Sequence, residues 1–115
     1  MAIEVPKEAE NDVLKMQQLQ QQLQFLSMQK QTLQTQSLEL EHSTEELKKV
    51  VKEDVFEIVG AVMIKRDKDL LINDLIEKKR TLDLRQNAVE KQIDKVTAKV
   101  NEIQEKVMKM VKGGK

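Results

Sequence analysis

The 115-residue sequence contains no cysteine, tryptophan or tyrosine, and it has only two phenylalanines, three glycines and one proline. The absence of cysteine excludes a disulfide framework and a thiolate metal site, and it fits a reducing compartment. Aromatic residues make up 2% of the chain and charged residues 35%, which leaves little material for a globular core. No apolar run approaches the roughly 18 residues that a membrane-spanning helix needs. We therefore expect an elongated protein with no membrane partner.

The charge balance also excludes several classes of function. Twenty basic and twenty acidic residues give a formal net charge of zero, so we expect no nucleic-acid partner. The start of the chain, MAIEVPKEAEND, is too acidic for a signal peptide, which favours a cytoplasmic location. The single histidine, His42, lies near Glu41 and Glu45, a pattern more typical of a solvated helix face than of a metal site. We expect no catalytic residue, no metal, no cofactor and no nucleotide-binding loop, and hence no enzyme.

What the sequence does contain is a dense β-branched run, VFEIVGAVMIKR, over residues 55–66. Gly60-Ala61 separates two five-residue halves, the spacing of a β-hairpin with a type II′ turn. This register sets Val59 opposite Val62 and Ile58 opposite Met63. The alternative is a buried helical kink, which the short length and the β-branched composition disfavour.

Both faces of the predicted hairpin are largely apolar, and a two-stranded ribbon is marginal by itself in water. We therefore expect it to pair with hairpins of other subunits, giving a larger sheet or a closed intersubunit β-barrel that leaves no open edge. The alternative is a hairpin that folds back onto its own helices. The residues predicted to make assembly contacts are Val55, Phe56, Ile58, Val59, Val62, Met63 and Ile64.

On each side of the hairpin the sequence predicts a long heptad-patterned helix, at residues 9–52 and 68–111, with flexible tails at 1–8 and 112–115. The first helix is expected to bury Met16, Leu19, Leu23, Leu26, Lys30, Leu33, Ser37, Leu40, Thr44, Leu47 and Val51. The second is expected to bury Ile72, Leu75, Lys79, Leu82, Gln86, Val89, Ile93, Val96, Val100, Ile103, Val107 and Met110. The fold class is therefore mainly α, a long antiparallel two-helix coiled coil with a central hairpin.

Two registers of the helix pair satisfy this pattern, and one of them places Thr44 near Leu82 and Lys79 near Leu47. In either register both chain termini come together away from the hairpin. Apolar residues gather there on and off the heptad seam, with Val13 and Leu14 among those off it. Because methionine-rich surfaces adapt to varied apolar partners, we predict a binding surface for unfolded polypeptides. Its residues are Val13, Leu14, Met16, Val107, Met108, Met110 and Val111. An ordinary frayed coiled-coil end is the alternative.

Three segments together resemble the β-type subunit of archaeal prefoldin: KMQQLQQQLQFLSMQKQTL, VFEIVGAVMIK and INDLIEKKRTLDLR. The resemblance extends from about Leu14 to Val107 and implies a single prefoldin-like domain over residues 1–115. It also implies a hexamer of two α-type and four β-type subunits, with hairpins in β-barrels and coiled coils that hold unfolded polypeptides at their tips for a chaperonin, without nucleotide. Phe56 stands where many relatives carry tyrosine.

The sequence thus predicts an ATP-independent chaperone subunit. The competing hypothesis is a passive coiled-coil scaffold that joins specific folded partners and holds no unfolded chain.

Overall fold

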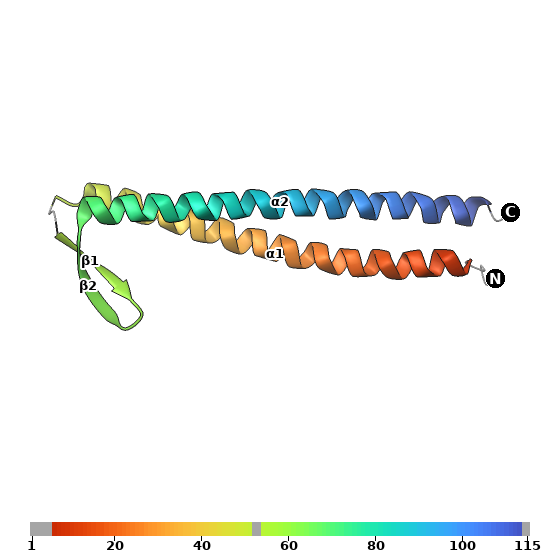
Figure 1. Cartoon of the computed structure of the whole chain (residues 1–115), viewed down its shortest axis with the longest axis horizontal. Helices are drawn as coiled ribbons and strands as arrows, with labels where there is room; N and C mark the ends of the chain where they lie inside the picture. Colours follow the sequence, from red (N-terminus) through yellow and green to blue (C-terminus); the bar gives the residue numbers. More distant parts are fainter. Residues whose placement is uncertain (1–5, 52–53, 114–115) are drawn as a thin grey trace. The chain divides into compact units, whose positions relative to one another are not determined.

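The computed structural model describes residues 6–51 and 54–113. In chain order the elements are helix α1 (Lys7–Lys49), strand β1 (Asp54–Val59), strand β2 (Val62–Asp67) and helix α2 (Lys68–Gly113) (Figure 1). The protein is mainly helical, with one two-stranded antiparallel sheet between the helices. The predicted fold class of two long helices and a central hairpin is confirmed.

Two units make up the chain, and each contains part of both helices. One comprises Met1–Lys30 with Ala88–Lys115, and the other is Gln31–Asn87, which includes the hairpin. In the first unit Lys30 lies beside Glu90, and Glu8 lies beside Lys106. In the second, Ser37 bonds to Asp83. The pairing of low with high residue numbers makes the helices antiparallel in both units.

The helix boundaries differ from the predicted ones at three places. Helix α1 begins at Lys7, because the Pro6 carbonyl accepts a hydrogen bond from the Glu10 amide at 3.0 Å and so starts the helical ladder. The predicted tail 1–8 is therefore wrong for Lys7 and Glu8, while residues 1–5 lie outside the described residues. Helix α2 extends two residues beyond the predicted end, to Gly113.

Helix α1 ends at Lys49, three residues before the predicted end. The Val50 amide bonds to the Leu47 carbonyl at 3.1 Å, and the Lys68 ammonium donates to the Val50 carbonyl at 2.7 Å. These bonds satisfy backbone groups that a longer helix would have used. Val51 is 96% exposed, so its predicted place in the seam is wrong.

The other predicted seam positions of both helices are buried or half-buried, which confirms the heptad assignment from Met16 to Leu47 and from Ile72 to Met110. The seam continues to Asp12 and to Ala9, which is fully buried. Val13, predicted to lie off the seam, is half-buried.

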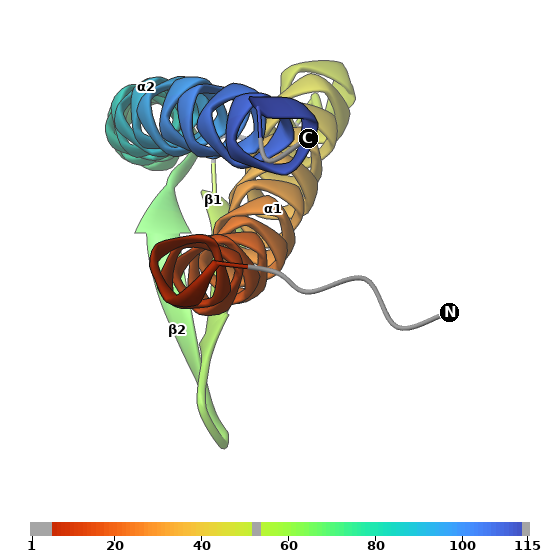
Figure 2. The ribbon, with the colours of Figure 1, turned by 90° about the vertical axis from the view of Figure 1, so that its right-hand side faces the viewer.

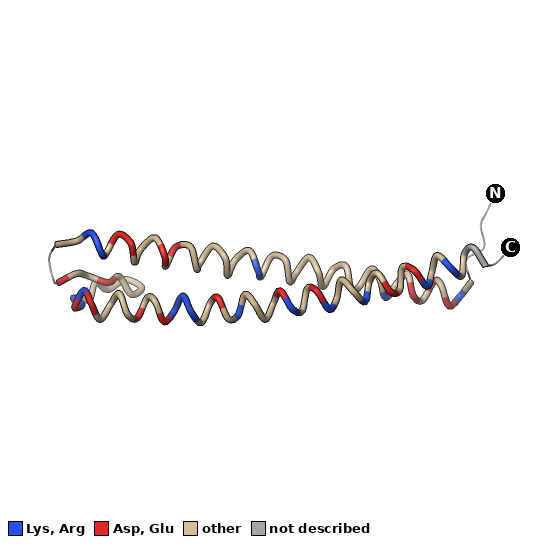
Figure 3. Tube along the Cα trace, turned by 90° about the horizontal axis from the view of Figure 1, so that it is seen from above, with Lys and Arg blue, Asp and Glu red and all other residues tan. Residues whose placement is uncertain are grey.

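Two polar residues in the seam of α1 have specific partners. Lys30 pairs with Glu90 at 3.4 Å, and the buried Thr44 hydroxyl donates to the Leu40 carbonyl of its own helix at 2.8 Å. In Figure 3 charged residues run along α2 and lie towards the two ends of α1, whereas the central part of α1 is nearly all uncharged.

The helix register follows from one apolar cluster near the hairpin. Leu71 and Leu75 form its helical part, and Leu47 packs against them. The register that places Lys79 near Leu47 is therefore wrong, because Leu47 packs against the cluster of Leu71 and Leu75 instead.

The hairpin has the predicted register, with Val59 opposite Val62 and Val55 opposite Arg66. Gly60 has a φ of 60°, and Ala61 has no positive φ, as a type II′ turn requires. At the other end, the Asp67 carboxylate accepts the Leu70 amide at 3.1 Å and caps α2 as expected. Figure 2 shows the two strands side by side, with β2 leading into the start of α2.

Asp83 connects the two helices within the hairpin unit. It accepts a hydrogen bond from Lys79 Nζ at 2.9 Å and another from Ser37 Oγ at 2.7 Å. The bond from Lys79, followed by that from Ser37, holds the pKa of Asp83 below its ordinary value. The carboxylate therefore stabilises the fold above its unfolded pKa, about 3.9, and this contribution is lost as the pH falls through the lower folded pKa.

We expect an Asp83→Asn variant to be less stable than the parent chain at neutral pH and to lose less stability on acidification. Thermal unfolding followed by circular dichroism between about pH 6 and pH 2 measures this, and the difference in Tm should narrow below about pH 4. Asp94→Asn, an exposed change on the same helix, is the control. A constant difference in Tm across the range would contradict the role assigned to Asp83.

Candidate functional site

The hairpin exposes six apolar side chains, which we call the hairpin surface: Phe56, Ile58, Val59, Val62, Met63 and Ile64. Their exposed fractions run from 43% for Ile64 to 72% for Ile58. Alternation along the strands places Phe56, Ile58 and Met63 on one face, and the other three on the opposite face. Apolar side chains on both faces of so small a sheet are typical of an element that is covered by another protein.

Charged side chains form ion pairs at the base of the hairpin, next to the hairpin surface. Lys65 pairs with Asp54 at 3.2 Å on the face that carries Phe56. On the other face Arg66 bonds to Glu57 at 3.0 Å and also to Asp74 of α2. The bond to Asp74, followed by that to Glu57, raises the pKa of Arg66 above its ordinary value. Arg66 thus ties the hairpin to the first turns of α2.

Val55 differs from the other predicted assembly residues. It is only 8% exposed and belongs to the cluster of Leu71 and Leu75, against which Leu40 and Leu47 pack. The base of the hairpin is therefore held by its own helices, as the alternative interpretation anticipated, while the hairpin surface beyond it stays exposed. The cluster fixes where the rest of the hairpin projects.

The two strands also expose their outer edges, because the sheet of the described residues has the order β1-β2 and nothing further. An outer edge carries amide and carbonyl groups that can pair with a strand of another chain. Pairing at an edge and burial of the apolar faces favour the same event, the addition of further strands. The geometry therefore supports a protein interface and not a small-molecule site.

A second candidate lies where α1 begins and α2 ends, and we call it the terminal surface. Leu14, Met108 and Val111 are 58%, 51% and 45% exposed. The other predicted members, Val13, Met16, Val107 and Met110, are half-buried. The structure thus brings all seven to one end of one unit, with three of them available to a partner and four that line the helix pair.

Lys106 joins the helices beside the terminal surface. Its ammonium lies 3.4 Å from Glu8 Oε1 and 3.4 Å from Asp12 Oδ2. These two carboxylates, Glu8 first, raise the pKa of Lys106 above its ordinary value. Sequence reasoning missed Asp12, although counting one heptad back from Leu19 reaches it. A carboxylate at a core position is tolerated here because a cation from the facing helix accompanies it.

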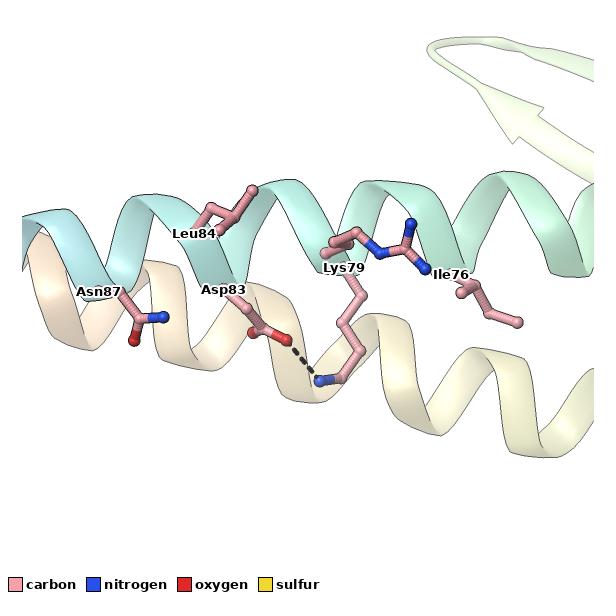
Figure 4. Close-up of a pocket in the computed structure, with 6 residues that line it drawn as sticks. Ile76, Lys79, Asp83, Leu84 and Asn87 are labelled. Atoms are coloured by element: carbon pink, nitrogen blue, oxygen red, sulfur yellow. Dashed lines mark hydrogen bonds and ion pairs between the residues drawn. The ribbon is translucent and has the colours of Figure 1, made fainter.

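A third candidate is a groove on α2, in the hairpin unit, which sequence reasoning did not predict. It is an open groove of about 300 Å³ lined by Ile76, Lys79, Arg80, Asp83, Leu84 and Asn87. Figure 4 shows Lys79 reaching to Asp83, with Leu84 on a different side of the helix. Lys79 and Asp83 form an ion pair, and Arg80 pairs with Glu77 at 3.1 Å, so the charged side chains that line the groove are all paired.

Residues 6–51 and 54–113 contain no group of three or more histidine, cysteine or carboxylate side chains arranged to hold a metal ion, and His42 is exposed. Neither described helix combines the length and the apolar character that crossing a lipid bilayer demands.

The sequence matches known proteins over most of its length. A family model described as prefoldin subunit matches residues 10–114. A prefoldin subunit beta of Archaeoglobus fulgidus is 34% identical over 109 residues, 94% of each chain. Another from Thermococcus onnurineus is 38% identical over 89 residues, which cover 76% of this chain and 77% of the relative.

The fold agrees with these matches. The crystal structure of the prefoldin beta subunit from Thermococcus strain KS-1 superimposes with a TM-score of 0.89 at 28% identity, covering 96% of this chain and 97% of that one. The resemblance inferred from the three sequence segments is thereby confirmed. Family match, relatives and fold agree, and we conclude that this chain belongs to the prefoldin subunit family of molecular chaperones.

Proposed function

We propose that this chain is a β-type subunit of a cytoplasmic hexamer, with two α-type and four β-type chains, that holds unfolded polypeptides and passes them to a chaperonin without ATP. The hairpin surface is the assembly contact, and the terminal surface is the client contact. The chain has no catalytic role of its own. The observation that carries the proposal is the hairpin itself, which is apolar on both faces and open at both edges.

Assembly through the hairpin follows from its energetics. Six large apolar side chains exposed to water disfavour an isolated subunit, and each would contribute roughly 1–2 kcal/mol if a partner covered it. Strands added at the two edges also pair the outward backbone groups. A closed barrel of hairpins covers the apolar side chains and pairs the edge strands, which supports the hetero-oligomer over the competing scaffold hypothesis.

Client holding at the terminal surface follows from the mixture of exposed and half-buried apolar residues there. Each subunit offers only three well-exposed members, so a single contact is weak. Several subunits that contact one client act together through their high effective concentration, while each contact remains quick to release. Weak, repeated contacts suit a chaperone that must let its client go.

For the assembly contact we expect Ile58→Lys to prevent incorporation of the chain into the hexamer. A charged side chain can be solvated on the isolated hairpin, where Ile58 is 72% exposed, but it cannot be buried without cost at a subunit contact. Native mass spectrometry of the chain mixed with an α-type subunit measures this. Leu38→Lys, at an α1 position that is 61% exposed, is the matched control and should assemble normally. Equal assembly of both variants would refute the contact.

For the client contact we expect the double variant Met108→Gln, Val111→Gln to assemble normally but to hold unfolded polypeptide about fivefold or more weakly. Glutamine keeps the helix, so the loss isolates the apolar contact. Light scattering during dilution of a chemically denatured protein measures the holding, with Leu38→Gln as the control. Unchanged suppression of aggregation by the double variant, in an intact hexamer, would favour the scaffold hypothesis.

A further inference from the structure

Helix α1 has an exposed face that neither the seam nor the terminal surface uses, apart from Leu14 at its end. At 100° per residue, five side chains lie within an arc of about 80° on this face. We call them the α1 stripe: Leu14, Gln18, Gln21, Phe25 and Met28. All five are exposed, and Phe25 and Met28 are each 68% exposed. They all belong to the unit that contains the terminal surface.

The stripe runs through a segment without charge. Residues 16–29 contain no acidic or basic side chain, and the next cation, Lys30, is paired with Glu90 of the other helix. Figure 3 shows this uncharged part of α1 beside an α2 that carries both signs of charge. A partner that covers the stripe from Gln18 to Met28 therefore removes no fixed charge from water, which makes burial inexpensive.

We propose that the α1 stripe is a second client contact, which binds an extended apolar segment of an unfolded polypeptide that the terminal surface has captured. The inference rests on the proposed client-holding function and extends it along the helix. Leu14 belongs to both surfaces, so the stripe continues the terminal surface without a gap.

The chemistry of the stripe distinguishes an unfolded chain from a docked helix. A helix seam needs apolar residues at successive spacings of three or four, whereas here Leu14 and Phe25 are eleven residues apart. Glutamines occupy the positions between them, and each carries an amide that both donates and accepts hydrogen bonds. An unfolded segment has unpaired backbone amides and carbonyls to bond with them, while a helix has already paired its own. The alternation of apolar and amide groups therefore suits an extended backbone.

The dimensions also fit. Leu14 and Met28 are fourteen residues apart, which is about 21 Å along a helix. An extended polypeptide covers that distance with about six residues. Such a segment would set its apolar side chains against Phe25, Met28 and Leu14 and its backbone against Gln18 and Gln21. Without charge on the stripe, binding there should also be nearly independent of the client's net charge and of salt.

The test uses the assembled hexamer and a reduced, carboxymethylated polypeptide that stays unfolded and carries a fluorescent label. We expect Phe25→Gln, Met28→Gln to lower its affinity about fivefold while the hexamer mass stays unchanged. Leu38→Gln should leave the affinity unaltered. Unchanged affinity of the stripe variant would overturn the inference, and so would loss of the hexamer, because the stripe would then be a subunit contact.

A photoreactive phenylalanine analogue at position 25 supplies an independent readout. We expect it to crosslink to the labelled polypeptide, and the same analogue at position 38 should not. Crosslinks to a neighbouring subunit, or none, would contradict the proposal. The terminal variant Met108→Gln, Val111→Gln shares no residue with the stripe variant, so an effect of the terminal variant alone would leave the proposed function intact and reject only the stripe.

Discussion

The constraint on which this structure depends is the exposure of an apolar two-stranded hairpin. A ribbon of this size is marginal in water, and here it is tied to the helices at its base, where Val55 joins Leu71 and Leu75 and where Arg66 joins Glu57 and Asp74. These contacts fix the direction of the hairpin without covering it. The exposed part of the hairpin has the properties of one side of a protein–protein interface. Membership in the prefoldin subunit family agrees with this interpretation.

The helices, unlike the hairpin, bury most of their apolar side chains in a seam between them. Their seam mixes aliphatic residues with Lys30, Ser37 and Thr44, each of which has a defined partner. Polar seam positions reduce the gain from burial but restrict the register, because only one alignment brings Ser37 to Asp83. Over residues 16–29 the outer face of α1 is uncharged and rich in glutamine, and it exposes Phe25 and Met28. We relate that composition to the handling of an unfolded chain.

Much of the fold could be predicted from the sequence because its determinants are local. The heptad spacing identified the seam, and Gly60 with its flanking β-branched residues identified the hairpin and its register. Contacts distant in sequence were not predictable. The end of α1 depends on Lys68 reaching the Val50 carbonyl, and the burial of Val55 depends on the helix register, which the heptads left open. The residues of the two candidate surfaces could be predicted from the sequence, but only the structure shows which of them are exposed.

The most direct measurement is amide hydrogen exchange of β1 and β2 in the isolated chain and in the complex recovered with a tagged copy of it. Val59 and Val62 flank a two-residue turn, so alternation directs the amides of Phe56, Ile58, Met63 and Lys65 outward, away from the partner strand. If the hairpin is the assembly contact, these four amides exchange rapidly in the isolated chain and become strongly protected in the complex. Equally rapid exchange in both would contradict assembly through the hairpin.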